Sequence, residues 1–223
     1  MILWLLLFLL VLAISFILAF QSMRDYHEIP QKTDWEYGLF LIKNSAAFSS
    51  ELLDILYQQI NKEGLLISVE RLFKGKESAF CLFGPKKILE TYTESLDLLE
   101  LEDYTNIDKE QISAWEVGIG QVLENGQKVF GNLPQLLESE QYWWQITIGK
   151  SFTSQIRAVL FSKDLQRREE LAKAFQNLSN NFVKLPSPYS VGQIFEFFKQ
   201  RSLVKDSAIL VLNSKQIIQL SKI

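Results

Sequence analysis

The chain has 223 residues and a formal net charge of −3, with 23 Lys and Arg against 26 Asp and Glu. So small a net charge excludes a strong general attraction to nucleic acid or to an acidic membrane surface. Hydrophobic residues make up 48% of the chain, and 10 Gly and 5 Pro are too few for a disordered or repetitive polymer, so the composition predicts a folded core. The single cysteine, Cys81, excludes an intramolecular disulfide and favours a reducing compartment.

The first twenty residues, 1–20, contain no charged side chain. As a helix rising about 1.5 Å per residue, this run matches the roughly 30 Å hydrocarbon core of a bilayer. We therefore predict a transmembrane anchor at residues 1–22, which contains Trp4, Leu10 and Phe20, and a juxtamembrane linker at 23–34. A cleaved signal peptide is the alternative, but the run is long, no basic residue precedes it, and it ends in a bulky side chain.

Basic residues predict the orientation of this anchor. Arg24 and Lys32 follow the apolar run, and no basic residue precedes it. The positive-inside rule then places the remaining residues in the cytoplasm. The predicted localisation is the plasma (inner) membrane, with a single span and a cytoplasmic body, and the lipid bilayer is one predicted partner.

A regular order of elements begins at Trp35. Short apolar runs indicate strands, and Ser49 and Pro85 are suitable starts for helices. The predicted elements are a strand at 37–43, a helix at 51–62, strands at 65–73 and 78–83, a helix at 86–96 and a strand at 98–104. This order is that of a ferredoxin-like unit, which we place at 35–105.

The pattern then returns with an offset of 79 residues, as between Ile67 and Ile146 (146 − 67 = 79) or Phe80 and Val159 (159 − 80 = 79). The predicted elements are a strand at 115–123, a helix at 132–140, strands at 142–149 and 155–161, a helix at 163–179 and a strand at 182–185. A single α+β domain that repeats the pattern by accident is the alternative.

The predicted fold class is therefore α+β, with an N-terminal transmembrane helix followed by two tandem ferredoxin-like units at 35–105 and 112–186. A C-terminal extension at 187–223 follows them. Its predicted elements are a helix at 191–201, a strand at 208–212 and a helix at 214–221 capped by Asn213 or Ser214. A second strand is the alternative for 214–221.

No segment carries a catalytic motif. The nearest approach to a phosphate-binding loop, 120–128, has the wrong spacing and no hydroxyl residue after Lys128. His27, the only histidine, lies in the predicted linker, so a histidine-based triad is not expected. Cys81 lies within an apolar strand and is predicted to be a core residue. We predict no catalytic residue, no metal or cofactor site and no enzyme activity.

Acidic side chains gather near the end of the first unit: Asp97, Glu100, Glu102 and Asp103. Such carboxylates suit a divalent cation or a shared proton. On a strand whose leucines alternate with them, however, they are more simply the solvated face, and we prefer that interpretation.

Six residues are predicted to bind a partner. The adjacent cations Lys86–Lys87 and Arg167–Arg168 begin equivalent helices of the two units, where they oppose the helix dipole, so local stability does not explain them. A solvated surface is the alternative. Trp143 and Trp144 are neighbours in a strand and point to opposite faces, so one must lie on the open face of the sheet. Either the C-terminal helix or a partner then covers that ring.

Three short motifs give the chain a family resemblance. They lie at 80–87 (FCLFGPKK), 99–104 (LELEDY) and 210–218 (LVLNSKQII). With the apolar N-terminal run, they resemble the membrane-anchored N-terminal region of conjugation and type IV secretion-type ATPases with a HerA-like motor, as found in candidate-phyla bacteria. The sequence stops where such proteins continue into the phosphate-binding loop, so the resemblance implies an anchor and scaffold module and does not extend to ATPase activity.

We therefore expect a non-catalytic, membrane-anchored scaffold or adaptor that docks a cytoplasmic motor or a secretion or DNA-transfer component. A separate HerA-like ATPase is the partner that the resemblance implies. The main alternative is a membrane-tethered, ligand-binding regulatory protein, and a third is an enzyme with an unrecognised carboxylate site. Direct nucleic-acid binding is not expected, and the pattern is compatible with an oligomer.

Overall fold

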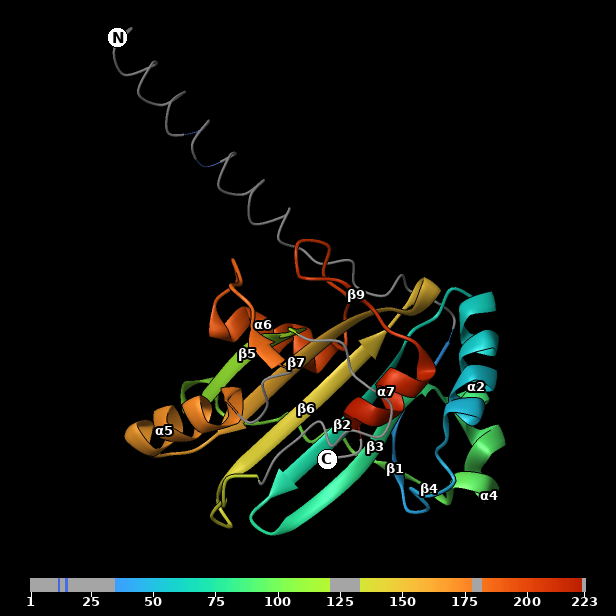
Figure 1. The fold of residues 1–223 in the computed structure, drawn as a ribbon, viewed down its shortest axis with the longest axis horizontal. Coiled ribbons are helices and arrows are strands. Elements are labelled where there is room, and N and C mark those ends of the chain that lie inside the picture. The colour runs from blue at the N-terminus through green and yellow to red at the C-terminus, as the bar shows by residue number, and fades with distance from the viewer. Residues whose placement is uncertain (1–11, 13–14, 16–34, 121–132, 178–181, 222–223) are drawn as a thin grey trace, which may run out of the picture.

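The computed structural model describes Leu12, Ser15 and residues 35–120, 133–177 and 182–221. These residues form a nine-stranded antiparallel sheet in the order β4-β1-β3-β2-β6-β7-β5-β8, with β9 paired to β7 (Figure 1). The strands are β1 (Tyr37–Ile42), β2 (Ile67–Lys74), β3 (Glu77–Pro85), β4 (Leu98–Leu101), β5 (Ile112–Ile119), β6 (Gln141–Ile148), β7 (Thr153–Phe161), β8 (Phe182–Lys184) and β9 (Leu210–Val211).

Helices cover the two faces of this sheet unequally. Apolar side chains of α2, α3, α4, α5 and α7 join one large core on the first face, whereas α6 packs on a separate cluster on the opposite face. The helices are α2 (Ser50–Lys62), α3 (Lys86–Leu89), α4 (Thr93–Leu96), α5 (Leu165–Gln176), α6 (Val191–Gln200) and α7 (Ser214–Ser221), with short 3-10 turns η1 (Glu90–Tyr92), η2 (Lys109–Gln111) and η3 (Lys150–Phe152).

Capping side chains set the helix boundaries. Ser49 accepts a hydrogen bond from the backbone N–H of Leu52, so α2 begins within one residue of its predicted start. Asn213 accepts from the backbone N–H of Gln216, and α7 follows it over the predicted span. The helix predicted at 86–96 is present as three short segments, α3, η1 and α4.

The two halves of the sheet meet at β2 and β6, which pair from Ile67 with Ile148 to Lys74 with Gln141. Read from its outer edge inward, each half has its strands in the same chain order: β4-β1-β3-β2 and β8-β5-β7-β6. Pairing satisfies the backbone groups that β2 and β6 would expose as the edges of separate sheets. The halves are similar in topology but share one sheet.

The predicted fold class of two tandem ferredoxin-like units with separate sheets is therefore wrong. The pairing of β2 with β6 merges the halves into one sheet. The helix predicted at 132–140 is also not formed in the described part of that segment, 133–140. There Leu136 enters the core, and the side chain of Glu140 accepts a hydrogen bond from the backbone N–H of Leu137 at 2.8 Å, which closes a turn.

The predicted transmembrane anchor and the localisation derived from it are also corrected. Among the described residues, no helix has the length and apolar character needed to cross a bilayer. The predicted anchor at 1–22, with Trp4, Leu10 and Phe20, lies almost entirely outside those residues, as does the linker at 23–34. The structure gives no support to a single-pass inner-membrane protein with a cytoplasmic body, and that placement is withdrawn.

A strained turn between β6 and β7 depends on a hydrogen bond from α2. Ser151 and Phe152 both have a φ of 56°, which is unfavourable for residues other than glycine. The Tyr57 hydroxyl accepts from the backbone N–H of Phe152 at 2.7 Å and donates to the carbonyl of Gly149 at 3.1 Å. The Tyr57 ring also stacks on Phe152, so one side chain holds the turn.

We predict that Tyr57→Phe lowers the free energy of unfolding by about 1–3 kcal/mol, because it leaves backbone groups of the turn without a partner. Urea denaturation measures this change. Tyr92→Phe is the matched control, since among the described residues its hydroxyl bonds only to the exposed Gln59, and it should change stability by less than about 0.5 kcal/mol. Equal effects of the two variants would contradict the assigned role of Tyr57.

Candidate functional site

A buried cluster of polar and charged side chains lies on the sheet face that carries α6. Glu70, in the middle of β2, accepts hydrogen bonds from Gln145 on β6 at 3.0 Å and from the Tyr104 hydroxyl at 2.7 Å. Arg201, which ends α6, lies 3.0 Å from Glu70 through Nε and 2.7 Å from Asp103 through Nη1. Four segments of the chain are therefore joined at one carboxylate.

The centre of this cluster is closed to solvent. The side chains of Glu70 and Arg201 are 0% and 2% exposed. Burial acts to lower the pKa of Arg201, but Glu70, Tyr104 and Asp103 outweigh it, so the pKa is raised. Burial and the Glu70 carboxylate together raise the pKa of Tyr104 well above its ordinary value. The charges of Glu70 and Arg201 are paired with each other and shielded from solvent. We therefore interpret them as a structural ion pair that a substrate cannot reach.

A second buried cation holds the segment that follows α6. Arg157, on β7, donates to the carbonyl of Ser202 at 2.7 Å and lies 3.9 Å from Glu116 on β5. Burial lowers the pKa of Arg157 to about 10, and Glu116 opposes the shift. Beside it, the Gln155 side chain accepts from the backbone N–H of Val204 at 2.9 Å. These bonds fasten the chain after α6 against the sheet.

The predicted acidic cluster is divided among separate partners. Glu100 lies 2.7 Å from Lys86, Asp97 lies 3.8 Å from Lys43, and Asp103 belongs to the buried cluster. Among the described residues, no group of three or more His, Cys, Asp or Glu side chains is placed to hold a metal ion. Glu100 and Glu102 are exposed, as the preferred interpretation expects. The predicted alternation fails at Leu99, however, which is 46% exposed, while Leu98 is the buried leucine of β4.

Burial makes the thiol of Cys81 unreactive. Cys81 is fully buried on β3, as the sequence predicts. Burial, together with the nearby Glu70 carboxylate, raises the pKa of the thiol to about 12, so the thiolate form is scarce at neutral pH. His27 lies outside the described residues.

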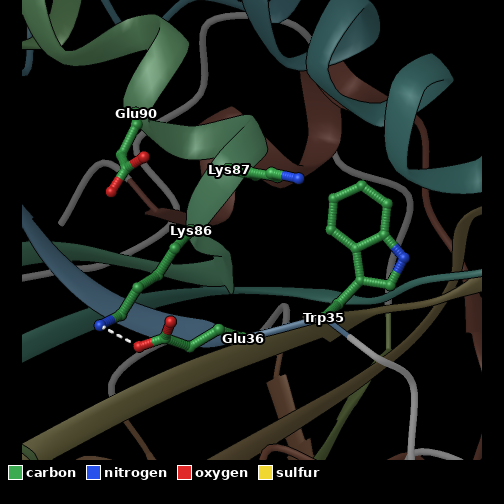
Figure 2. A pocket seen from close by; sticks show the side chains of 5 residues that line it. All are labelled: Trp35, Glu36, Lys86, Lys87 and Glu90. Carbon is green, nitrogen blue, oxygen red and sulfur yellow. Dashed lines mark ion pairs between the residues drawn. The ribbon is translucent and has the colours of Figure 1, made fainter.

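A recess of about 440 Å³ lies beside the start of α3, lined by Trp35, Glu36, Lys86, Lys87 and Glu90. Lys86 points toward Glu36, whereas Lys87 leaves the helix in another direction, on the Trp35 side (Figure 2). The Lys86 ammonium lies 2.6 Å from Glu36, and hydrogen bonds to Glu100 and Glu36 raise its pKa. Lys87 has no ion pair within the described part of the chain, so the recess holds one free cation but no convergent polar set.

Gly38 allows Lys86 to reach its two carboxylates. A Cβ atom at Gly38 would lie 2.9 Å from Cγ and 3.0 Å from Cε of Lys86. The aliphatic part of the lysine therefore crosses β1 where no side chain blocks it, and its ammonium reaches both Glu36 and Glu100. Lys86, which was predicted to bind a partner, instead forms ion pairs within the fold.

A smaller groove of about 240 Å³ is more apolar. It lies over β3, β2 and β6, on the side of the buried polar cluster, and its apolar lining includes Leu72, Ala79, Tyr104 and Trp143. Leu72 and Trp143 are cross-strand partners at the junction of the two halves. This apolar groove, formed by these residues and edged by the β2–β3 turn, is the second candidate binding surface.

The two tryptophans lie on opposite faces, as predicted. Trp144 belongs to the large core under the helices, and Trp143 packs beneath α6, with its ring centroid 5.9 Å from that of Phe198. Their exposed fractions are 2% and 1%. The helix α6 therefore covers Trp143, as one of the two predicted alternatives requires, and the ring forms the floor of the apolar groove with almost no exposed surface of its own.

Arg167 and Arg168 both form bonds to other parts of the fold. Arg167 lies 3.3 Å from Glu140 and donates to the carbonyl of Gln135 at 2.8 Å, and Arg168 donates to the carbonyl of Ser162 at 2.9 Å. The helices α3 and α5 lie toward opposite ends of the sheet (Figure 1). The lysine and arginine pairs therefore do not combine into one basic patch.

Comparisons of the chain with protein-family models, curated proteins and solved structures found no match. The resemblance to secretion-type ATPases with a HerA-like motor consequently stays a prediction. The same is true of the expected absence of enzyme activity and of a cofactor.

Sequence reasoning did not identify Glu70, Arg157 or Arg201 as organising residues. A usable signal was present, because Glu70, Glu116 and Arg157 are charged residues in the middle of strands, and each directly follows a bulky apolar side chain. Such a residue must find a partner when the strand is buried. The identity of the partner depends on strand order, which local patterns do not give.

We predict that Arg201→Met lowers the free energy of unfolding by about 3–5 kcal/mol, because it leaves the Glu70 charge buried without a partner. Chemical denaturation measures the loss. The double variant Glu70→Gln with Arg201→Met should recover at least half of it, since the cluster then holds no buried charge without a partner.

Lys43→Met is the control for a lost cation. Its pair with Asp97 is exposed on both sides, so the expected loss is below about 1 kcal/mol. A loss in Arg201→Met no larger than this would show that the buried pair does not hold α6 in place.

Proposed function

We propose that this chain is a non-catalytic adaptor domain that binds another protein through the apolar groove. The observation that carries the proposal is the groove itself, where the half-buried Leu72, Ala79 and Tyr104 leave apolar surface open above the buried Trp143 ring, next to a face that is otherwise covered by α6. Open apolar recesses of this kind are typical of protein contact sites. The buried charges beside it are paired with one another, which leaves them without a chemical task.

The size of the groove favours a protein partner over a small ligand. Small-molecule sites commonly enclose about 300–1,000 Å³ and are largely apolar. At about 240 Å³, the apolar groove suits one or two side chains inserted from a partner surface. The Trp143 ring beneath it is the kind of rigid aromatic that supports such an anchor.

The class of partner follows only from the resemblance. A HerA-like motor, or a component of a secretion or DNA-transfer machine, is therefore the first partner to test. The proposal does not depend on a membrane anchor, because the groove belongs entirely to the described body.

A ligand-binding regulatory role is the second candidate function. It is favoured by the recess at Trp35, whose volume of about 440 Å³ falls within the usual range for small molecules. The recess also contains the Lys87 ammonium, which has no ion pair with any residue that the structure describes. Its lining is highly charged, however, and in Figure 2 Lys86 turns to Glu36 while Lys87 points in another direction. The apolar groove is therefore the better supported site.

A photo-crosslinking amino acid placed at Ser78, an exposed residue that lines the groove, tests the adaptor role in cells. We expect a discrete crosslinked protein, identified by mass spectrometry, and we expect Leu72→Arg to reduce its yield by about tenfold, because a charge blocks the groove.

The matched control carries the same crosslinker at Ile55, which is exposed on α2, on the other face of the sheet. The proposal fails if Ser78 gives no product above Ile55, or if Leu72→Arg leaves the product unchanged while the variant melts at the wild-type temperature.

A further inference from the structure

Among the strands that the structure describes, β4 forms one outer edge of the sheet. Among the described residues, β4 pairs only with β1, whereas β1, β3, β2, β6, β7 and β5 each have a strand on both sides. An unpaired edge presents backbone groups that a further strand can take up.

The register shows which groups face outward. Residues on β1 and β4 pair as Leu41 with Leu99 and Phe40 with Glu100, and the backbone N–H of Lys43 donates to the carbonyl of Asp97. Hydrogen-bonded pairs alternate along an antiparallel ladder, so Leu99 is bonded to β1. The N–H and C=O groups of Glu100, and of Leu98 two residues before it, therefore point away from β1.

Side chains at this edge supply an apolar contact on one face. Leu99 is 46% exposed, and its cross-strand partner Leu41 is half-buried. Leu101 lies on the same face of β4 as Leu99, since residues two apart in a strand share a face. A strand added beside β4 would place its apolar side chains next to these leucines.

The charged side chains around the edge indicate which kind of strand would bind there. Glu94 and Glu102 are exposed and form no ion pair within the described ranges, and Asp97 is also exposed. Lys43 and Lys86 lie at this edge, but they are already paired with Asp97 and Glu100. The edge is therefore acidic and complements basic side chains.

We propose that the β4 edge binds an extended segment of a partner protein in which basic and apolar residues alternate. The segment adds as a further strand, its backbone bonds to Leu98 and Glu100, its apolar side chains cover Leu99 and Leu101, and its basic side chains meet the surrounding carboxylates. This inference shares with the proposed function the premise that the chain works through protein contacts, but it concerns a surface separate from the apolar groove.

A second copy of the chain is a poorer occupant. Pairing β4 with β4 of another copy would bring the two sets of exposed carboxylates together, and like charges across paired strands are destabilising. The acidic surroundings therefore favour a basic partner over self-association.

The test uses the full chain and labelled peptides of eight residues in which Lys and Val alternate. Fluorescence anisotropy should show binding that weakens as salt is raised, and a Glu–Val peptide should not bind. One peptide is N-methylated on every Val and another on every Lys. Because a strand uses one edge for pairing, one of these two should lose binding by about tenfold or more and the other should retain it.

Hydrogen exchange and two variants complete the test. The amides of Leu98 and Glu100 should gain protection in the complex. Leu99→Glu should weaken peptide binding by about tenfold, whereas Leu72→Arg, in the apolar groove, should leave peptide binding unchanged. The two variants therefore test the proposed edge site and the proposed groove site separately.

Three results would overturn the proposal. They are equal binding by both N-methylated peptides, protection confined to the groove residues, and protection of Leu98 and Glu100 by self-association of the chain without peptide.

Discussion

The pairing of β2 with β6 is the contact on which the rest of the structure depends. It joins two four-stranded halves of equal strand order into one sheet and removes two edges that would otherwise be open. It also determines which side chains lie at the centre of each face of the sheet. On the helix-covered face, Ile67 and Val69 meet Ile148 and Ile146, and the junction becomes part of the large core.

The opposite face of the same junction is polar, and this explains the C-terminal segment. There the junction pairs Glu70 with Gln145, and neither residue has access to water. A carboxylate in this position requires a cation and hydrogen-bond donors, because its desolvation is otherwise prohibitive. Arg201 and Tyr104 supply them, so the chain after α6 is held by electrostatics where its apolar helix ends.

One proposed contact surface is a part of this face that the C-terminal segment leaves open, and the other is an outer strand edge. The apolar groove lies at the next pair along the junction, Leu72 with Trp143, just beyond the polar pairs. The edge of β4 lies at the end of the sheet, where strand pairing stops. Both surfaces follow from strand order, and neither uses the buried charges, which accords with a domain that works by binding.

The sequence by itself determined the local elements. Ser49 and Asn213 marked helix starts through their capping bonds, and the alternation at Trp143 and Trp144 correctly placed the two rings on opposite faces. Only the tertiary structure decided that the halves share one sheet, that 133–140 forms a turn, and that Arg201 belongs to Glu70. Caps and side-chain periodicity act between neighbouring residues and can be read from order alone. The pairing of two strand edges, and the partner of a buried charge, depend on residues far apart in the chain, and they are fixed only when burial makes an open edge or a lone charge unfavourable.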